Sequence, residues 1–212
     1  MKDQSATVCI VDDDEAVRSA LKLLLKTLGV PVLAYGSAQE FLAAFDPQRR
    51  GCLVLDIRMP GMSGLELQQE LNVRGALAPI IFITGHGDVP MAVEAMQHGA
   101  MDFLQKPFRD QDLLDRINKA LEKDRAGREL LGNRERIQAR IADLTPRERE
   151  VLTLVTAGKA NKVIAADLNL SQRTVEIHRA HVMEKMGANS LAHLVRMVIE
   201  AGAPAPGAPQ QA

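Results

Sequence analysis

The stretch Cys52-Leu-Val-Leu-Asp56-Ile-Arg-Met-Pro60 contains an apolar run that ends on a carboxylate. A short, continuous apolar run is typical of a strand that is buried on both faces of a parallel sheet. A second such run, Val8-Cys-Ile-Val11, is followed by Asp12-Asp-Asp14. Because sites in open α/β folds form outside the carboxyl ends of the strands, two such strands side by side would bring these carboxylates into one crevice. Their repulsion is costly unless a cation offsets it, so the pattern predicts a hard-metal site with a candidate nucleophile.

Around this stretch, short β-rich runs alternate with helical patterns, which is typical of βαβ units. The fold class expected for residues 1–123 is α/β, a five-stranded, doubly wound parallel sheet of flavodoxin-like type. Its strands are expected at 7–11, 31–35, 52–56, 80–84 and 102–104.

Capping signals mark several helix starts. Ser37-Ala-Gln-Glu40 and Thr145-Pro-Arg-Glu148 both match the capping box, and the proline of the second suits the first helical position. Asp88 is the expected N-cap of a helix with an early proline, and Gly29 is expected to close the first helix.

From Asp110 the chain turns helical and highly charged, with one apolar stripe at Leu113, Leu114, Ile117 and Leu121. Gly127 and Gly132 follow, and each glycine costs ~1 kcal/mol in a helix interior. We therefore expect helix, hinge, helix, with residues 124–143 as a helical interdomain linker.

An all-helical module is expected over residues 144–201, with four helices at 146–157, 161–168, 172–186 and 190–201. The short connection between the second and third helices has the spacing of a helix-turn-helix, although a plain helical bundle has the same pattern. The tail at 202–212 is rich in Ala, Pro, Gly and Gln, cannot bury a core, and is expected to be disordered.

Composition excludes some classes of protein. No apolar run approaches the ~20 residues that span a bilayer, and the N-terminus lacks a signal-peptide pattern. Cys9 and Cys52 fall in predicted core strands, where buried thiols are favoured over a disulfide or redox pair, so we expect a cytoplasmic protein without membrane contact. The net charge of −1 conceals an acidic excess in residues 1–109 and a slight basic excess in residues 145–212, which is weak evidence for nucleic acid.

The strand ends predict phosphoryl chemistry. Asp12, Asp13, Asp56, Thr84 and Lys106 all follow or end predicted strands, and the carboxyl ends of parallel strands share one edge of the sheet. A carboxylate can attack phosphorus to form an acyl phosphate, and the charge that develops needs a cation, an ammonium and a hydroxyl donor. Mg²⁺, Lys106 and Thr84 suit those roles. Each residue alone could equally be a helix cap or a solvated loop residue.

The strings Ile10-Val-Asp-Asp13, Leu55-Asp-Ile-Arg-Met-Pro-Gly61, Ile83-Thr-Gly85 and Lys106-Pro-Phe108 resemble the receiver domain of bacterial two-component response regulators. The resemblance implies that a sensor histidine kinase phosphorylates Asp56. It also implies a cis peptide at Lys106-Pro107 and switching by Thr84 and Phe103. The Mg²⁺ ligands that it implies are Asp12, Asp13, Asp56 and the backbone carbonyl of Arg58.

The later module resembles the LuxR-type DNA-binding domain of the FixJ/NarL group, with Leu144-Thr-Pro-Arg-Glu148, Asn161-Lys162, Ile164-Ala165 and Thr174-Val175 among the matching strings. The resemblance implies phosphate contacts from Lys162, Ser171, Arg173, Thr174, Arg179 and Lys185, and groove-facing positions at Glu176, Ile177 and Ala180. Several relatives hold lysine where this chain has Glu176 and Ala180. A glutamate can accept a hydrogen bond from cytosine N4 but cannot contact phosphate, so we expect a different operator preference. His178 is expected to pack within the domain.

The sequence therefore predicts a non-enzymatic transcription regulator of the FixJ subclass. Phosphorylation of Asp56 with Mg²⁺ is expected to promote homodimerisation, binding to promoter DNA and contact with RNA polymerase. Two alternatives stay open: a Mg²⁺-dependent phosphatase that forms an acyl phosphate, and a constitutive DNA-binding protein or scaffold whose receiver is only structural.

Overall fold

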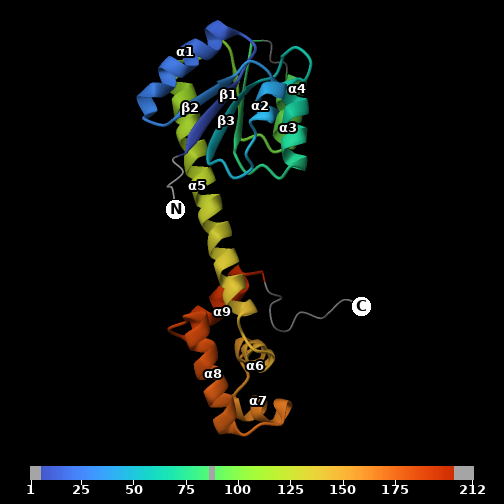
Figure 1. Cartoon of the computed structure of the whole chain (residues 1–212), viewed down its shortest axis with the longest axis vertical. Helices are drawn as coiled ribbons and strands as arrows, with labels where there is room; N and C mark the ends of the chain where they lie inside the picture. Colours follow the sequence, from blue (N-terminus) through green and yellow to red (C-terminus); the bar gives the residue numbers. More distant parts are fainter. Residues whose placement is uncertain (1–5, 86–88, 203–212) are drawn as a thin grey trace. The chain divides into compact units, whose positions relative to one another are not determined.

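A computed structural model describes residues 6–85 and 89–202 of the chain, coloured along the sequence in Figure 1. The chain divides into two compact units, Met1–Arg128 and Glu129–Ala212. The expected N-cap at Asp88 and the expected disordered tail from residue 203 onward lie outside the described residues. In the described part of the chain, no helix is both long enough and apolar enough to cross a membrane.

The first unit is built on a sheet of parallel strands in the order β2-β1-β3-β4-β5. This is the flavodoxin-like doubly wound order, so the expected fold class is confirmed. The expected strands are confirmed to within one residue at each end. Their bounds are β1 (Thr7–Val11), β2 (Val32–Tyr35), β3 (Gly51–Asp56), β4 (Ile80–Thr84) and β5 (Asp102–Gln105).

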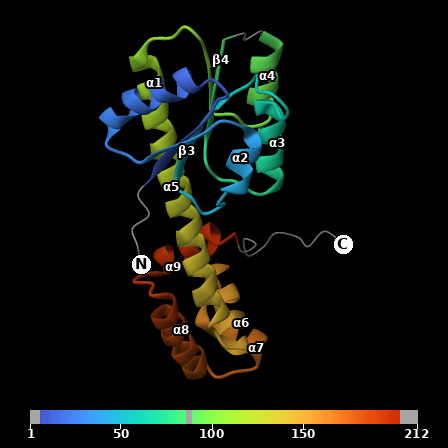
Figure 2. The same cartoon turned by 45° about the horizontal axis from the view of Figure 1, so that its top comes forward.

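Helices cover both faces of this sheet, as Figures 1 and 2 show for the first unit. On one face lie α2 (Ala38–Ala43), α3 (Gly64–Val73) and α4 (Val89–Gln97), whose apolar side chains form a core with alternate residues of β1, β3 and β4. On the other face lie α1 (Glu15–Leu25) and the first part of α5 (Asp110–Ala142). The predicted stripe of α5 is directed inward, with Leu113 and Ile117 fully buried. A short 3-10 turn, η1 (Lys26–Leu28), follows α1 and ends at Gly29, whose φ of 67° suits glycine.

The two cysteines are buried free thiols, as the sequence predicts. Cys9 belongs to the core on the α2, α3 and α4 side, whereas Cys52 belongs to the core on the α1 and α5 side. Because successive side chains of a strand point to opposite faces, neighbouring strands can carry the two thiols on opposite sides of the sheet. Burial raises the pKa of both thiols, that of Cys52 to about 12, which suppresses the reactive thiolate.

The expected capping boxes differ in outcome. Thr145 caps its helix with the reciprocal Glu148 bond, and Pro146 stands in the first turn. Ser37 accepts a hydrogen bond from the backbone N–H of Glu40, but the Glu40 carboxylate accepts from the Gly36 N–H at 2.6 Å rather than from that of Ser37. The N-cap at Ser37 is therefore confirmed, while the second half of its capping box is displaced by one residue.

The expected hinge near Gly127 and Gly132 is wrong, because α5 is one continuous helix from Asp110 to Ala142. Tertiary contacts hold it on both sides of the glycines. On the first side, buried Asp124 accepts a hydrogen bond from the Gly51 N–H at 2.9 Å and pairs with Arg128 at 2.7 Å. On the second side, Ile137 and Ile141 pack in the core of the second unit. Burial of the helix on each side offsets the conformational cost of the two glycines.

The second unit is all helical. Its four predicted helices are confirmed as α6 (Pro146–Thr156), α7 (Asn161–Leu168), α8 (Gln172–Met186) and α9 (Leu191–Glu200). Their core includes Ile164, Val175 and Leu194, and the end of α5 adds Ile137. The turn between α7 and α8 passes through Asn169, whose φ of 54° is a left-handed conformation that asparagine tolerates.

Candidate functional site

The sheet order brings the predicted acidic residues together. β1 pairs with β3 so that Val11 stands beside Leu55, and Asp12 and Asp56 come next on neighbouring strands. β4 lies on the other side of β3, and Thr84 at its end stands beside Gln105 of β5. Lys106 follows β5 directly. The five predicted side chains therefore belong to one edge of the sheet, as expected for parallel strands.

Lys106 connects the two buried carboxylates at this edge. Its Nζ lies 2.8 Å from Asp12 Oδ2 and 3.5 Å from Asp56 Oδ1. Asp12 and Asp56 are only 1% and 6% exposed, and Thr84 is 1% exposed, so the site is largely shielded from water. Charged hydrogen bonds between partners of this kind are stronger than neutral ones, since little water competes for them.

Backbone groups orient the same carboxylates. Asp12 Oδ1 accepts a hydrogen bond from the Asp14 N–H at 2.9 Å, and Asp56 Oδ2 accepts one from the Arg58 N–H at 3.1 Å. Asp13, in contrast, is exposed. The site thus has a fixed inner pair of carboxylates and an outer carboxylate in contact with solvent.

Burial raises the pKa of Asp56, and the neighbouring charge of Asp12 raises it further. The ammonium of Lys106 and the Arg58 N–H act in the opposite direction, but they do not cancel the effect of burial. A desolvated carboxylate is a poorly stabilised anion, so added positive charge at this edge would favour its ionised form.

The end of β5 carries the other expected features. The Lys106-Pro107 peptide is cis, as the resemblance implies. The Lys106 N–H donates a hydrogen bond to the Thr84 carbonyl at 2.8 Å, which ties the residue after β5 to the end of β4. Phe103 is partly buried and packs against the core on the α2, α3 and α4 side.

The donor set suits a hard divalent cation. Carboxylate and carbonyl oxygens are the ligands that Mg²⁺ prefers, and Asp12, Asp13, Asp56 and the Arg58 carbonyl all stand at this edge. Within residues 6–85 and 89–202, however, no group of three or more His, Cys, Asp or Glu side chains is arranged around a common metal position. The ammonium of Lys106 instead bridges the inner pair. The chemistry of these residues fits Mg²⁺, with Lys106 as the cation that compensates the buried carboxylates.

Two residues near the site were not predicted from the sequence. Arg18 of α1 donates from Nη1 to the Asp12 carbonyl at 2.8 Å. Gly64 opens α3 so close to the strand end that a Cβ there would lie 2.2 Å from the Asp56 carbonyl oxygen. The pattern Ser63-Gly64 before an apolar helix marks a helix start, but only the packing of α3 against the loop after Asp56 shows why glycine is needed.

In the second unit, α7 and α8 form the predicted helix-turn-helix. Ser171 is the N-cap of α8 and accepts a hydrogen bond from the Thr174 N–H at 3.0 Å. The groove-facing candidates Glu176, Ile177 and Ala180 are all exposed, and Ile177 is 48% exposed. Lys162, Ser171 and Arg173 are also exposed, and Thr174 is partly buried. The first half of α8 therefore presents a free surface.

Two other candidates for DNA contact already have partners within the domain. Arg179 donates from Nη1 to Asn161 Oδ1 at 2.7 Å, and Lys185 Nζ lies 2.7 Å from Glu148 Oε2. His178 is partly buried, in agreement with a packing role, and its Nδ1 is buried without a hydrogen-bond partner among the described atoms.

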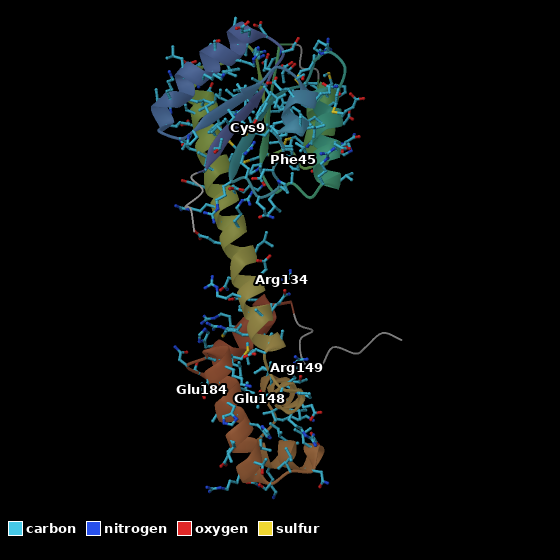
Figure 3. The ribbon with its side chains drawn as sticks, viewed as in Figure 1. Cys9, Phe45, Arg134, Glu148, Arg149 and Glu184 are labelled. Carbon is cyan, nitrogen blue, oxygen red and sulfur yellow. The ribbon has the colours of Figure 1, made fainter. Side chains whose placement is uncertain are left out.

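Glu148, labelled in Figure 3, is the buried acid of this unit, and the sequence marked it only as part of a capping box. Its carboxylate accepts hydrogen bonds from Lys185 and from the Thr145 N–H at 2.8 Å, and His181 Nδ1 lies 3.8 Å away. The Lys185 ammonium and the Thr145 backbone bond together lower its pKa to about 2. Glu148 thus joins α6 to the end of α8.

Comparisons with known proteins agree with this organisation. Residues 8–118 match the response regulator receiver domain family, and residues 142–198 match the family of bacterial regulatory proteins of luxR type. Nodulation protein W of Bradyrhizobium diazoefficiens is 50% identical over 91% of this chain and 85% of its own length. The transcriptional regulatory protein FixJ of Azorhizobium caulinodans is 50% identical over 94% of both chains.

Solved structures give the same result. The response regulator StyR has a TM-score of 0.84 at 44% identity, covering 92% of this chain and 99% of its own. Full-length FixJ from B. japonicum has a TM-score of 0.58 at 44% identity, covering 93% and 97%. With both domain families matched in this order and half of the residues identical to FixJ, the chain belongs to the response regulators, as a FixJ-like transcription regulator with a receiver domain and a LuxR-type DNA-binding domain.

Proposed function

We propose that Asp56 accepts a phosphoryl group from the phosphohistidine of a sensor kinase, and that this modification promotes dimerisation and promoter binding. The observation that carries the proposal is the position of the Lys106 ammonium, which contacts both buried carboxylates, Asp12 and Asp56, at the sheet edge where Thr84 also stands. This combination of a shielded carboxylate, an ammonium and a hydroxyl matches what phosphoryl transfer to a carboxylate requires.

In the transfer, an oxygen of Asp56 attacks phosphorus. The new P–O bond forms as the P–N bond to the donor imidazole breaks, and the imidazole takes up a proton from solvent as it leaves. Lys106 and the Thr84 hydroxyl donate to the phosphoryl oxygens, where negative charge accumulates. Attack of water on the resulting acyl phosphate returns the Asp56 carboxylate and inorganic phosphate, which erases the signal.

Asp12, Asp13, Asp56 and the Arg58 carbonyl would hold Mg²⁺ in this proposal. When bound, Mg²⁺ supplies positive charge that offsets the repulsion between these carboxylates and an incoming phosphoryl group. The exposed Asp13 leaves the outer side of the site accessible, whereas buried Asp12 fixes its inner side.

The signal reaches DNA through two changes in the proposed cycle. Thr84 moves toward the phosphoryl group and Phe103 changes rotamer, which alters the receiver surface and favours a homodimer. The helix-turn-helix then binds a promoter with two-fold symmetry, since two half-sites raise specificity beyond that of one small module, and contacts RNA polymerase. The proposed domains are the receiver at 1–123, the connecting helix at 124–143 and the DNA-binding domain at 144–201.

Lys162, Ser171, Arg173, Thr174, Arg179 and Lys185 are the proposed phosphate contacts, while Glu176, Ile177 and Ala180 face the groove. The exposure of Ile177 at 48% supports an apolar contact with a thymine methyl group.

A comparison of the wild type with Asp56→Asn tests the proposal, and Asp46→Asn, a partly exposed acid outside the site on the same unit, is the matched control. With a small acyl phosphate donor and Mg²⁺, mass spectrometry should find one phosphoryl group on wild type and control but none on Asp56→Asn. Light scattering and genome-wide DNA binding should then show donor-dependent dimers and promoter occupancy only where the phosphoryl group is present. Donor-independent binding by all three proteins would favour the constitutive alternative, and rapid turnover of a small phosphoester would favour the phosphatase.

A further inference from the structure

A hollow of about 140 Å³ lies in the second unit between the end of α5 and the last helix, α9. Basic residues dominate its lining. Arg136 and Arg140 come from α5, His193 and Arg196 come from α9, and Asn133 and Glu200 complete the rim. None of these residues belongs to the helix-turn-helix formed by α7 and α8.

Neighbouring arginines on α5 have clear structural roles. Arg134, labelled in Figure 3, donates from Nε to the Ala201 carbonyl at 3.3 Å, and Arg140 donates from Nη1 to the Met186 carbonyl at 2.6 Å. Both bonds satisfy carbonyl groups at the C-terminal ends of helices, where such groups lack partners within the helix. These two arginines therefore brace α9 and α8 against α5.

Arg136 and Arg196 have no such role. Among the residues that the structure describes, neither guanidinium makes a hydrogen bond or an ion pair with another side chain or with the backbone. The acid on the rim, Glu200, accepts a hydrogen bond from Asn133 at 3.0 Å and keeps its charge, which three guanidiniums in the lining outnumber. Two unpaired guanidiniums thus line a hollow in which a third, Arg140, is only partly satisfied.

The side chains of Arg136, Arg140 and Arg196 are exposed, and together they concentrate positive charge at this hollow. Arg136 and Arg140 are an i, i+4 pair of like charge, which destabilises a helix by roughly 0.2–0.5 kcal/mol. Arg196 adds positive charge from the facing helix. Guanidinium groups match phosphate oxygens in geometry and can bind them through two parallel hydrogen bonds.

The size of the hollow limits the ligand. A volume of 140 Å³ accommodates several water molecules, since about 10–15 Å³ of cavity volume is enough for one. This is enough for one or two phosphoryl groups with remaining water, but it is below the 300–1,000 Å³ or so of a site that encloses a drug-sized ligand.

We propose that this hollow binds the phosphate or diphosphate group of a small anionic ligand, and that the bound group bridges α5 and α9. The position of the hollow disfavours a DNA backbone as its ligand. The candidate DNA contacts Arg173 and Thr174 lie at the start of α8, whereas Arg140 binds the carbonyl of Met186 at its end. Lys185 is the DNA-contact candidate next to that end, and its ammonium already pairs with Glu148 at 2.7 Å. A helix of 15 residues separates these ends by about 20 Å.

Isothermal titration of the full chain with pyrophosphate tests the proposal, without Mg²⁺ and at constant ionic strength, so that the receiver site does not contribute. Arg136→Gln and Arg196→Gln remove the two unpaired charges, and neither change removes an internal bond. Arg147→Gln is the matched control, since this exposed arginine pairs with Glu150 on α6, outside the hollow. Each pocket variant should weaken binding at least tenfold, while the control stays within twofold of wild type.

Titration with inorganic phosphate and with a nucleoside diphosphate distinguishes the sources of the anion. Equal affinity for pyrophosphate and the nucleotide assigns the hollow to the diphosphate group alone, while tighter binding of the nucleotide assigns it to a nucleotide ligand; both support the proposal. The absence of binding to wild type overturns it. An equal loss in Arg147→Gln, or a loss confined to Arg173→Gln on the helix-turn-helix, also overturns it.

Discussion

Replacement of Glu148 by glutamine should destabilise the DNA-binding domain more than the same replacement of an exposed acid. Glu148 is 4% exposed, and its carboxylate accepts hydrogen bonds from Lys185 Nζ at 2.7 Å and from the Thr145 N–H at 2.8 Å. Glutamine keeps the size of the side chain and its hydrogen-bonding oxygen but removes the charge. The variant therefore isolates the charge of the pair from its packing.

The magnitude follows from the pKa. A carboxyl whose pKa falls from 4.5 to about 2 on folding gains about 3 kcal/mol from its partners, here the Lys185 ammonium and the neutral Thr145 N–H. Lys185 is 33% exposed, so solvent screens part of this interaction and the released ammonium can recover some hydration. We expect a loss of about 2 kcal/mol in the free energy of unfolding at pH 7, which is within the range for hydrogen bonds to charged groups.

The sign of the pH dependence provides a second test. Because folding lowers the pKa of Glu148, its stabilising contribution is fully present above pH 4.5 and is lost as the pH falls toward about 2. Wild type and Glu148→Gln should therefore converge in acid.

Urea unfolding followed by hydrogen exchange of α6 and α8 peptides measures this domain within the full chain. Glu150→Gln is the control, because its partner Arg147 is 50% exposed and such a pair contributes less than about 1 kcal/mol. If Glu148→Gln is no less stable than Glu150→Gln at pH 7, or if its loss is as large near pH 2, the argument from the charged pair is wrong.

Three further outcomes follow from the structure. Asp56→Asn should be more stable than wild type at pH 7, since burial raises the pKa of Asp56 and ionisation therefore costs stability; thermal unfolding should show this gain vanish as the pH falls below the ordinary value of 3.8. Gly64→Ala should unfold or distort the receiver, because its Cβ would lie 2.2 Å from the Asp56 carbonyl oxygen. Gly132→Ala, whose Cβ would have nothing within 4 Å, should instead stabilise α5 by about 1 kcal/mol in urea titrations. Arg173→Ala should weaken promoter binding at all sequences and lower the salt dependence of log K by about one, as measured by fluorescence anisotropy at several salt concentrations.

Much of the receiver site could be predicted from order along the chain. Apolar runs that end on Asp12 and Asp56 indicate buried parallel strands, and the carboxyl ends of such strands always share an edge. Thr84 at the end of β4 and Lys106 after β5 then complete the set of residues that phosphoryl transfer needs. Sequence order does not give distances, so the bridging position of Lys106 and the close approach of Gly64 could not be inferred.

Local sequence signals predicted helix caps but not the contacts made by more distant residues. Ser37 and Thr145 were both identified as helix caps, because an N-cap depends on a few neighbouring residues. The predicted hydrogen-bond donor to the Glu40 carboxylate was wrong by one residue, because the conformation of the loop before the helix decides which N–H reaches it. The expected hinge at Gly127 and Gly132 failed for a related reason: helix propensity is a weak preference that packing on both sides of the glycines overrides.

The sequence by itself determined the fold class, the two families of domain and the residues with the right chemistry, because periodicity, caps and strand-end residues are local properties of the chain. The tertiary structure alone decided which charges meet. Lys185 lies 37 positions from Glu148, and Arg196 lines the same hollow as Arg136 across two helices. Such pairings depend on how helices pack, and the free energy of a charge depends on its burial and its partners, neither of which the order of residues specifies.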